Sequence, residues 1–229
     1  HKANVISVSV GSGFCYGSLG MTHHGTEDIA IMRSLPYMNV VAPGDPKETQ
    51  YATEYFAQGH GPVFLRLGRA GEPVVHENGI NWQFGKAIKF RNGKDLTIIA
   101  TGSMLKKAVE TANILELEGL RVNVLSMHTI KPLDENAILE AANSTSRIVT
   151  LEEHSIHGGL GGAVAEVLLE KFDAKINFRR FGLPSEFTKH IGSQEYLIRQ
   201  YRLTPEQIAN DIWLWIDTKK EKYRKLRSA

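Results

Sequence analysis

The sequence predicts an α/β protein with two units, each built on a largely parallel sheet. β-rich and helical stretches alternate from one end of the chain to the other, as they do in repeated strand–helix units. The alternation weakens once, between about residues 71 and 94, where glycines, prolines and scattered polar residues indicate a connection between domains. The 229 residues suffice for two modest domains on either side of it.

The first unit opens with an alternating apolar run at residues 5–10, which predicts a strand. A glycine-rich loop follows. A helix is expected after Thr26, because Glu27 and Asp28 stand where a helix N-terminus favours negative charge, and Pro36 ends it.

A second strand–helix–strand unit is expected next, beginning with a short strand at residues 39–42. Asp45 is predicted to cap a helix with Pro46 in its first position and Glu48 as a reciprocal acidic cap. The chain then returns as a strand at residues 62–67.

The remaining sequence alternates more regularly. Strands are expected at residues 96–101, 122–126, 148–151 and 176–181. Helices are expected after a cap at Ser103, from Asp134, over 159–172, around 193–201 and from 204 onward.

We therefore divide the chain into residues 1–75, a connection at 76–94 with a short hairpin around Trp82–Phe90, and residues 95–229. The chain enters a strand within its first residues, so the sheet of the first unit looks cut and a longer parent protein is expected. Residues 95–229 are expected to fold independently as a three-layer α/β domain.

Composition excludes several classes of protein. The net charge of +2 is too small to indicate nucleic acid or an anionic membrane as the main partner. The single cysteine, Cys15, excludes an internal disulfide and favours a reducing compartment. No apolar run approaches the roughly 20 residues of a membrane helix, and no signal-peptide pattern opens the chain, so we expect a cytoplasmic protein.

His23 and His24 lie in a loop that leads into a helix. Adjacent side chains point in different directions, so this pair is not expected to bind one metal ion. A histidine in such a loop can carry a proton or donate a hydrogen bond to a substrate oxygen. The alternative is a surface histidine beside a helix cap.

Arg66 and Arg69 stand at the end of the last strand of the first unit. Open α/β sheets bind ligands beyond the carboxyl ends of their strands, and the planar guanidinium group suits phosphate. The two arginines are therefore candidate substrate-binding residues, although an ion pair with Asp28 or Glu72 would explain either one.

A third cluster runs from Glu152 to Gly162, after a strand and before a helix. Its glycines suggest a dinucleotide-binding loop, but their spacing is not G-x-G-x-x-G and no ribose-binding acid follows. Close packing of a helix against a sheet or a partner chain explains the glycines as well.

In combination, these clusters resemble the transketolase family. The second half of its pyrimidine-binding domain is similar in order to Gly20–His23, Glu27–Asp28, Met32–Met38, Val41–Asp45 and Gly61–Arg69. Its C-terminal domain is similar to residues 96–103, 129–134, 152–155 and 182–184. The resemblance covers nearly the whole chain and fits the C-terminal subunit of transketolases whose gene is split in two.

The resemblance implies an incomplete pyrimidine-binding domain followed by a smaller C-terminal domain. It implies transfer of a two-carbon ketol unit between sugars, often phosphorylated, with thiamine diphosphate and Mg²⁺ in the complete enzyme. His23 aligns with the histidine that faces the thiazolium and contacts substrate hydroxyls, and Arg69 with the arginine that binds the sugar phosphate. The implied partners are an N-terminal transketolase section and a second copy in a dimer.

Several features depart from the family's pattern. The glutamate that activates the cofactor and the diphosphate and metal site belong to regions that precede this sequence, so the chain alone is expected to bind no cofactor and to be inactive. Leu19 replaces an acidic residue, and the family's histidine near Gly11 is missing. The alternatives are an enzyme similar to 1-deoxyxylulose-5-phosphate synthase, or a non-catalytic module for dimerisation or regulation.

Overall fold

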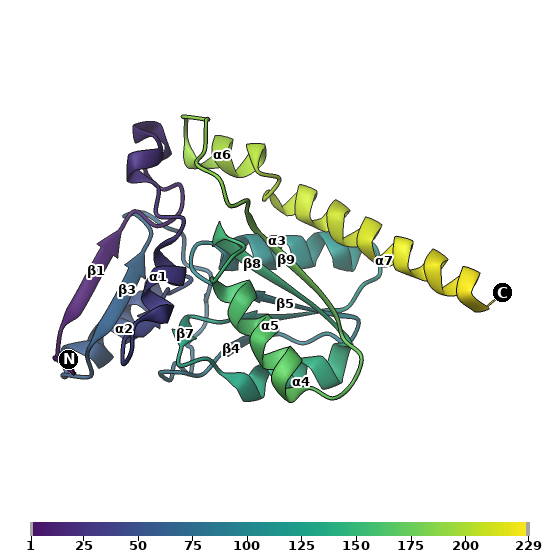
Figure 1. Cartoon of the computed structure of the whole chain (residues 1–229), viewed down its shortest axis with the longest axis horizontal. Coiled ribbons are helices and arrows are strands. Elements are labelled where there is room, and N and C mark those ends of the chain that lie inside the picture. The colour runs from purple at the N-terminus through teal and green to yellow at the C-terminus, as the bar shows by residue number, and fades with distance from the viewer. Residues whose placement is uncertain (1, 228–229) are drawn as a thin grey trace.

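The computed structural model describes residues 2–227, and side chains as far as Asp217. Two sheets, both dominated by parallel pairs, form the framework of the molecule (Figure 1). The predicted α/β class is confirmed. Within the described residues, no helix combines the length and the apolar character needed to cross a membrane.

The first sheet has four strands in the order β1–β3–β2–β7. It comprises β1 (Ile6–Val10), β2 (Asn39–Val41), β3 (Val63–Leu67) and β7 (Thr129–Lys131). The first three are parallel, and β7 is antiparallel to β2. Side chains alternate between the faces of a strand, so one face of β2 and β3 packs on α1 (Asp28–Ser34) and the other on α2 (Pro46–Ala57).

β1 lies at one edge of this sheet, and its only strand neighbour in the described residues is β3. The side chains of Ile6, Val8 and Val10 lie on the α2 side of the sheet, because they are in register with Val63 and Leu65, yet they remain exposed. This part of the molecule therefore presents an uncovered apolar stripe beside an open strand edge.

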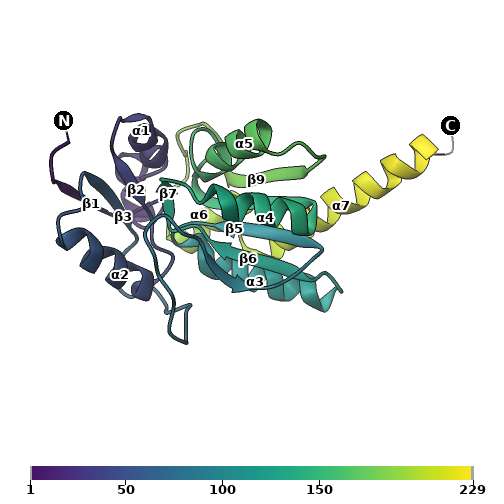
Figure 2. The ribbon, with the colours of Figure 1, turned by 90° about the horizontal axis from the view of Figure 1, so that it is seen from below.

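The second sheet has five strands in the order β4–β6–β5–β8–β9. It comprises β4 (Ile88–Arg91), β5 (Leu96–Ala100), β6 (Val122–Ser126), β8 (Arg147–Ser155) and β9 (Asn177–Leu183). One face packs on α3 (Met104–Leu117), α6 (Gln194–Gln200) and α7 (Pro205–Arg227). The other face packs on α4 (Glu135–Thr145) and α5 (Leu160–Lys171), which completes three layers (Figure 2).

Two strands connect the units more closely than the sequence pattern predicts. β4 does not form the expected hairpin around Trp82–Phe90; it pairs antiparallel with β6 at the edge of the second sheet. β7 comes from the C-terminal part of the chain but extends the first sheet. The two sheets therefore share an interface in which Ile130 and Ala163 pack against Ile29 and Phe64.

Candidate active-site residues

His23 lies near the tip of a loop that leaves the carboxyl end of β1 and returns to α1. The loop contains two short 3-10 turns, Gly17–Leu19 and Met21–His23. Gly13 and Gly25 exchange backbone hydrogen bonds of 2.9 and 3.0 Å that close its base. The His23 imidazole is exposed, and its Nδ1 lies 3.0 Å from Thr22 Oγ1. The imidazole is thus available to a group outside the chain.

His24 has a different environment, as expected for adjacent residues in a loop. Its ring is half-buried and meets the Phe14 ring edge-on, with 5.0 Å between centroids. Its Nε2 lies 3.4 Å from the Gly17 carbonyl oxygen. His24 therefore helps to shape the loop, whereas His23 is left facing outward.

Arg66 lies in the protein interior, with 2% of its side chain exposed. Its Nε donates to both carboxylate oxygens of Asp28, at 3.0 and 2.8 Å. Its Nη2 donates to the carbonyl oxygens of Gly25 at 2.7 Å and Glu153 at 3.0 Å. Of the two roles that the sequence left open for Arg66, the structure contains the ion pair with Asp28, so we assign this side chain to the interior framework.

Arg69 follows β3 and reaches solvent, with 53% of its side chain exposed. Its Nη2 lies 3.9 Å from Glu195 Oε1, which is at the limit of an ion pair. The side chain lines a cleft of about 300 Å³ together with residues of the α3 and α6 N-termini, among them Ser103, Lys107 and Gln194. Of the two arginines, only Arg69 lies where an anionic ligand could approach it.

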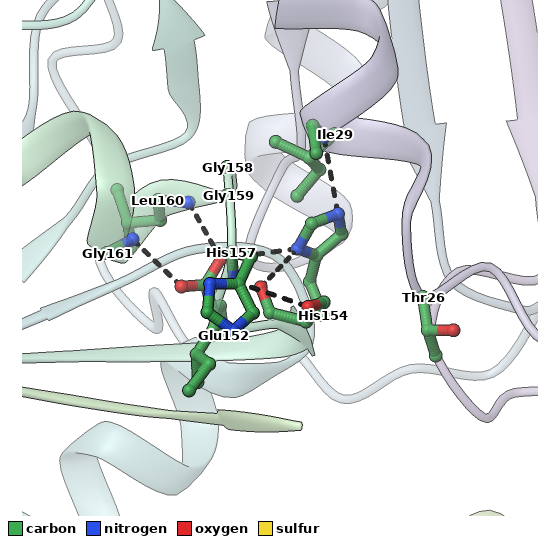
Figure 3. Close-up of polar contacts among 12 residues, drawn as sticks. Thr26, Ile29, Glu152, His154, His157, Gly158, Gly159, Leu160 and Gly161 are labelled. Carbon is green, nitrogen blue, oxygen red and sulfur yellow. Dashed lines mark hydrogen bonds and ion pairs between the residues drawn. The ribbon is translucent and has the colours of Figure 1, made fainter. Parts of the chain in front are cut away.

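The cluster from Glu152 to Gly162 closes a helix end, and the dinucleotide interpretation does not fit it. The buried Glu152 carboxylate accepts hydrogen bonds from the backbone N–H groups of Leu160 at 2.7 Å and Gly161 at 2.8 Å (Figure 3). It thereby occupies the N-terminus of α5, where a phosphate would bind. A side chain at Gly159 would collide with Glu152.

The same cluster packs α5 against α1, so the close-packing interpretation is confirmed. Gly158 has a φ of +73°, and a Cβ there would lie 2.7 Å from Ala30 Cβ. Arg33 donates to the Gly158 carbonyl oxygen at 2.7 Å and pairs with Glu166 at 2.7 Å. These contacts join the two units behind the His23 loop.

Two titratable groups in this interface have displaced pKa values. Burial raises the pKa of Glu152 to about 7. Burial, and next the positive charge of Arg66, lower the pKa of His154, so its imidazole is neutral at pH 7. The His154 Nδ1 lies 2.7 Å from the Ser155 carbonyl oxygen, and its Nε2 accepts from the Ala30 N–H at 3.3 Å (Figure 3). This histidine therefore supports α1 from within the interior.

One buried carboxylate in this region is not singled out by sequence patterns. Glu153 accepts hydrogen bonds from Phe14, Ser103 and Gln194, which lie in three separate segments. The paired glutamates at 152 and 153 are visible in the sequence, but their opposite directions depend on the strand register and the packing of α6.

The described residues do not form a metal site: no three or more of their His, Cys, Asp and Glu side chains are grouped to hold an ion. A diphosphate held through Mg²⁺ needs oxygen ligands arranged around the ion. The side chains between residues 2 and 217 therefore do not fit the metal-bound part of a thiamine diphosphate site, and we assign no cofactor ligand to them.

Comparison with protein families matches both units. The model of the transketolase pyrimidine-binding domain matches residues 1–72, and that of the transketolase C-terminal domain matches residues 85–208. One of the two subunits of the apulose-4-phosphate transketolase of Phocaeicola vulgatus is 41% identical over 90% of this chain, which spans 65% of that protein. A 1-deoxy-D-xylulose-5-phosphate synthase of Heliobacterium modesticaldum is 37% identical over 88% of the chain and 31% of that protein.

The solved structures agree with this assignment. A split-gene transketolase described as an inactive beta4 tetramer superimposes with a TM-score of 0.82 and is 38% identical, covering 91% of this chain and 66% of that one. The chain thus spans slightly less than two thirds of the split-gene relatives that it matches. Both family domains and the fold place this chain in the transketolase family.

Proposed function

We propose that this chain is the C-terminal subunit of a thiamine-diphosphate-dependent transketolase, which transfers a two-carbon ketol unit between sugars. The observation that carries the proposal is its 41% identity, over 90% of its length, to a protein named as a transketolase subunit. We place thiamine diphosphate and Mg²⁺ in the complete enzyme, formed with an N-terminal transketolase subunit in the cytoplasm.

Within that enzyme, His23 is proposed as the catalytic residue of this chain. It is exposed at the end of a loop whose base is closed by the Gly13–Gly25 hydrogen bonds. A neutral imidazole can donate a hydrogen bond through one nitrogen and accept one through the other, which suits contact with a substrate hydroxyl whose proton moves. The bound cofactor would supply the carbon nucleophile.

Arg69 is proposed to bind the phosphate of a phosphorylated sugar. The cleft that it lines contains the cations Lys106 and Lys107, but also three carboxyl groups, so the site is not strongly basic. Burial, and next the charge of Glu153, raise the pKa of Glu72, which lines the same cleft. A guanidinium group gives such a mixed site a geometric preference for phosphate.

Steady-state kinetics of the complete enzyme tests both roles. His23→Ala should lower kcat with a smaller effect on cofactor affinity, because its contact is made at the reacting oxygens. Arg69→Ala should weaken the use of phosphorylated sugars by roughly 1.5–3 kcal/mol, the cost of a lost charged hydrogen bond. Equal losses with phosphorylated and unphosphorylated sugars would contradict the phosphate role.

A second enzyme function is favoured by one specific comparison. The Heliobacterium modesticaldum relative named as a 1-deoxy-D-xylulose-5-phosphate synthase is 37% identical to this chain. Product analysis of the complete enzyme separates the two reactions: formation of 1-deoxy-D-xylulose 5-phosphate would replace our proposal. A complex that binds the cofactor but turns over no sugar would instead indicate a non-catalytic module.

We also propose that the chain associates with a second copy. Exposed apolar side chains of Leu19, Met21, Phe187 and Ile191 belong to two loops, and Ile191 lies near Gly20. Apolar surface of this kind favours a contact between chains. The similar split-gene transketolase is described as a tetramer of one chain type. Light scattering should give the mass of at least two chains, and a protease-resistant monomer would contradict the proposal.

A further inference from the structure

Glu153 joins three segments that are far apart in the sequence. The residue is 2% exposed and lies near the carboxyl end of β8. Its Oε1 accepts a 2.6 Å hydrogen bond from the Phe14 N–H, and its Oε2 accepts one of 2.6 Å from Ser103 Oγ. The Gln194 amide donates to both oxygens, at 3.0 and 2.9 Å. A carboxylate only accepts, so the three donors fix its orientation and it fixes theirs.

The bond to Phe14 fixes the loop that carries His23. The Phe14 ring is buried in the core of the second unit and stacks on Tyr201, with 5.4 Å between centroids. Gly13, immediately before it, forms the two backbone bonds to Gly25 that close the loop. The position of His23 relative to the second unit therefore depends on the anchor at residue 14.

The bonds to Gln194 and Ser103 fix the cleft that carries Arg69. Gln194 is the first residue of α6, and the next residue, Glu195, is the carboxylate beside Arg69. Ser103 and Gln194 themselves line that cleft. One side chain thus holds a wall of the Arg69 cleft and the base of the His23 loop at the same time.

We propose that Glu153 is a positioning residue that sets His23 and Arg69 relative to each other. It contacts neither the candidate catalytic imidazole nor the cleft's arginine in the hydrogen bonds described above, so its effect passes through the segments that it holds. The functional part of this inference rests on the proposed transketolase activity, whereas its structural part concerns this chain alone.

The adjacent Glu152 offers a matched control, because it is also a buried glutamate but binds the Leu160 and Gly161 amides instead. Residue-resolved amide hydrogen exchange of the 229-residue chain is the measurement. In Glu153→Gln, an NH₂ group replaces one acceptor oxygen, so the Phe14 and α6 amides should exchange about tenfold faster or more, with Gly161 unchanged. Glu152→Gln should show the reverse pattern.

Gln194→Ala is a milder second variant, because it keeps the Glu153 carboxylate and its bond to Phe14. It should accelerate exchange in α6 and leave the Phe14 amide protected. Unchanged exchange at Phe14 and α6 in Glu153→Gln would overturn the proposal, as would identical patterns in Glu153→Gln and Glu152→Gln.

Kinetics of the complete enzyme then tests the functional part. Glu153→Gln should lower kcat and raise KM for phosphorylated sugars, whereas Gln194→Ala should mainly raise that KM. Wild-type values of kcat and KM in Glu153→Gln would contradict the positioning role even if the exchange pattern changes. If the wild-type complex transfers no ketol unit, the proposed function fails, while the exchange result still decides whether Glu153 holds these segments.

Discussion

Replacement of Arg66 by methionine should destabilise the chain strongly, because this side chain holds three groups of the interior. The change leaves the Asp28 carboxylate without its cation and removes the donor that two carbonyl oxygens share. Loss of one partner of a buried ion pair costs about 3–5 kcal/mol. Asp28 is 18% exposed, so water can solvate part of the released charge, and we expect the lower end, about 3 kcal/mol.

Urea unfolding monitored by circular dichroism gives the free energy of unfolding for this comparison. Arg69→Met is the matched control, since Arg69 is 53% exposed and its Glu195 contact is 3.9 Å, so it should cost less than about 1 kcal/mol. A double-mutant cycle with Asp28→Asn isolates the ion pair. A loss under about 1 kcal/mol for Arg66→Met, or equal losses for the two arginines, would refute the assignment of Arg66 to the framework.

Three further outcomes are expected. Calorimetric titration of the isolated chain with thiamine diphosphate and Mg²⁺ should show no tight binding; micromolar affinity would be inconsistent with a cofactor site completed by another subunit. The pKa of Glu152 is raised to about 7 by burial, so the folded chain holds a proton that the unfolded chain releases, and this group makes the free energy of unfolding fall as pH rises from about 4.5 to about 7. Glu152→Gln should remove that component of a urea-titrated pH profile, and an identical slope in both proteins would count against it. A fragment of residues 85–229, which retains β4, should unfold at higher urea than residues 95–229, which lacks this strand; equal midpoints would show that β4 contributes little.

Local patterns predicted most of the elements, because their causes lie within a few residues. Asp45 caps α2 as expected, accepting from the Glu48 N–H at 2.9 Å, and α1 ends before Pro36. The reciprocal bond differs by one residue: Glu48 accepts from the Gly44 N–H and also from Ser126 Oγ. The tertiary bond to β6 explains why this glutamate is buried and not at the helix surface.

Long-range partners were beyond local patterns. Ser103 was expected to cap α3, but its hydroxyl donates to Glu153, fifty residues away in sequence. The antiparallel β4 and β7 are short edge strands of four and three residues, and strands of that length carry little periodic signal. For the candidate site, the sequence indicated that Arg66 was an ion-pair or phosphate residue, and only its burial decides between them.

An active site divided between two subunits is tested by assaying ketol transfer with this chain, an N-terminal transketolase subunit, thiamine diphosphate and Mg²⁺ together. We predict transfer from a ketose donor to an aldose acceptor when both chains are present, none with either chain alone, and a large loss of kcat for His23→Ala. Transfer by this chain alone, or full activity of the complex without the His23 imidazole, would contradict the proposed division.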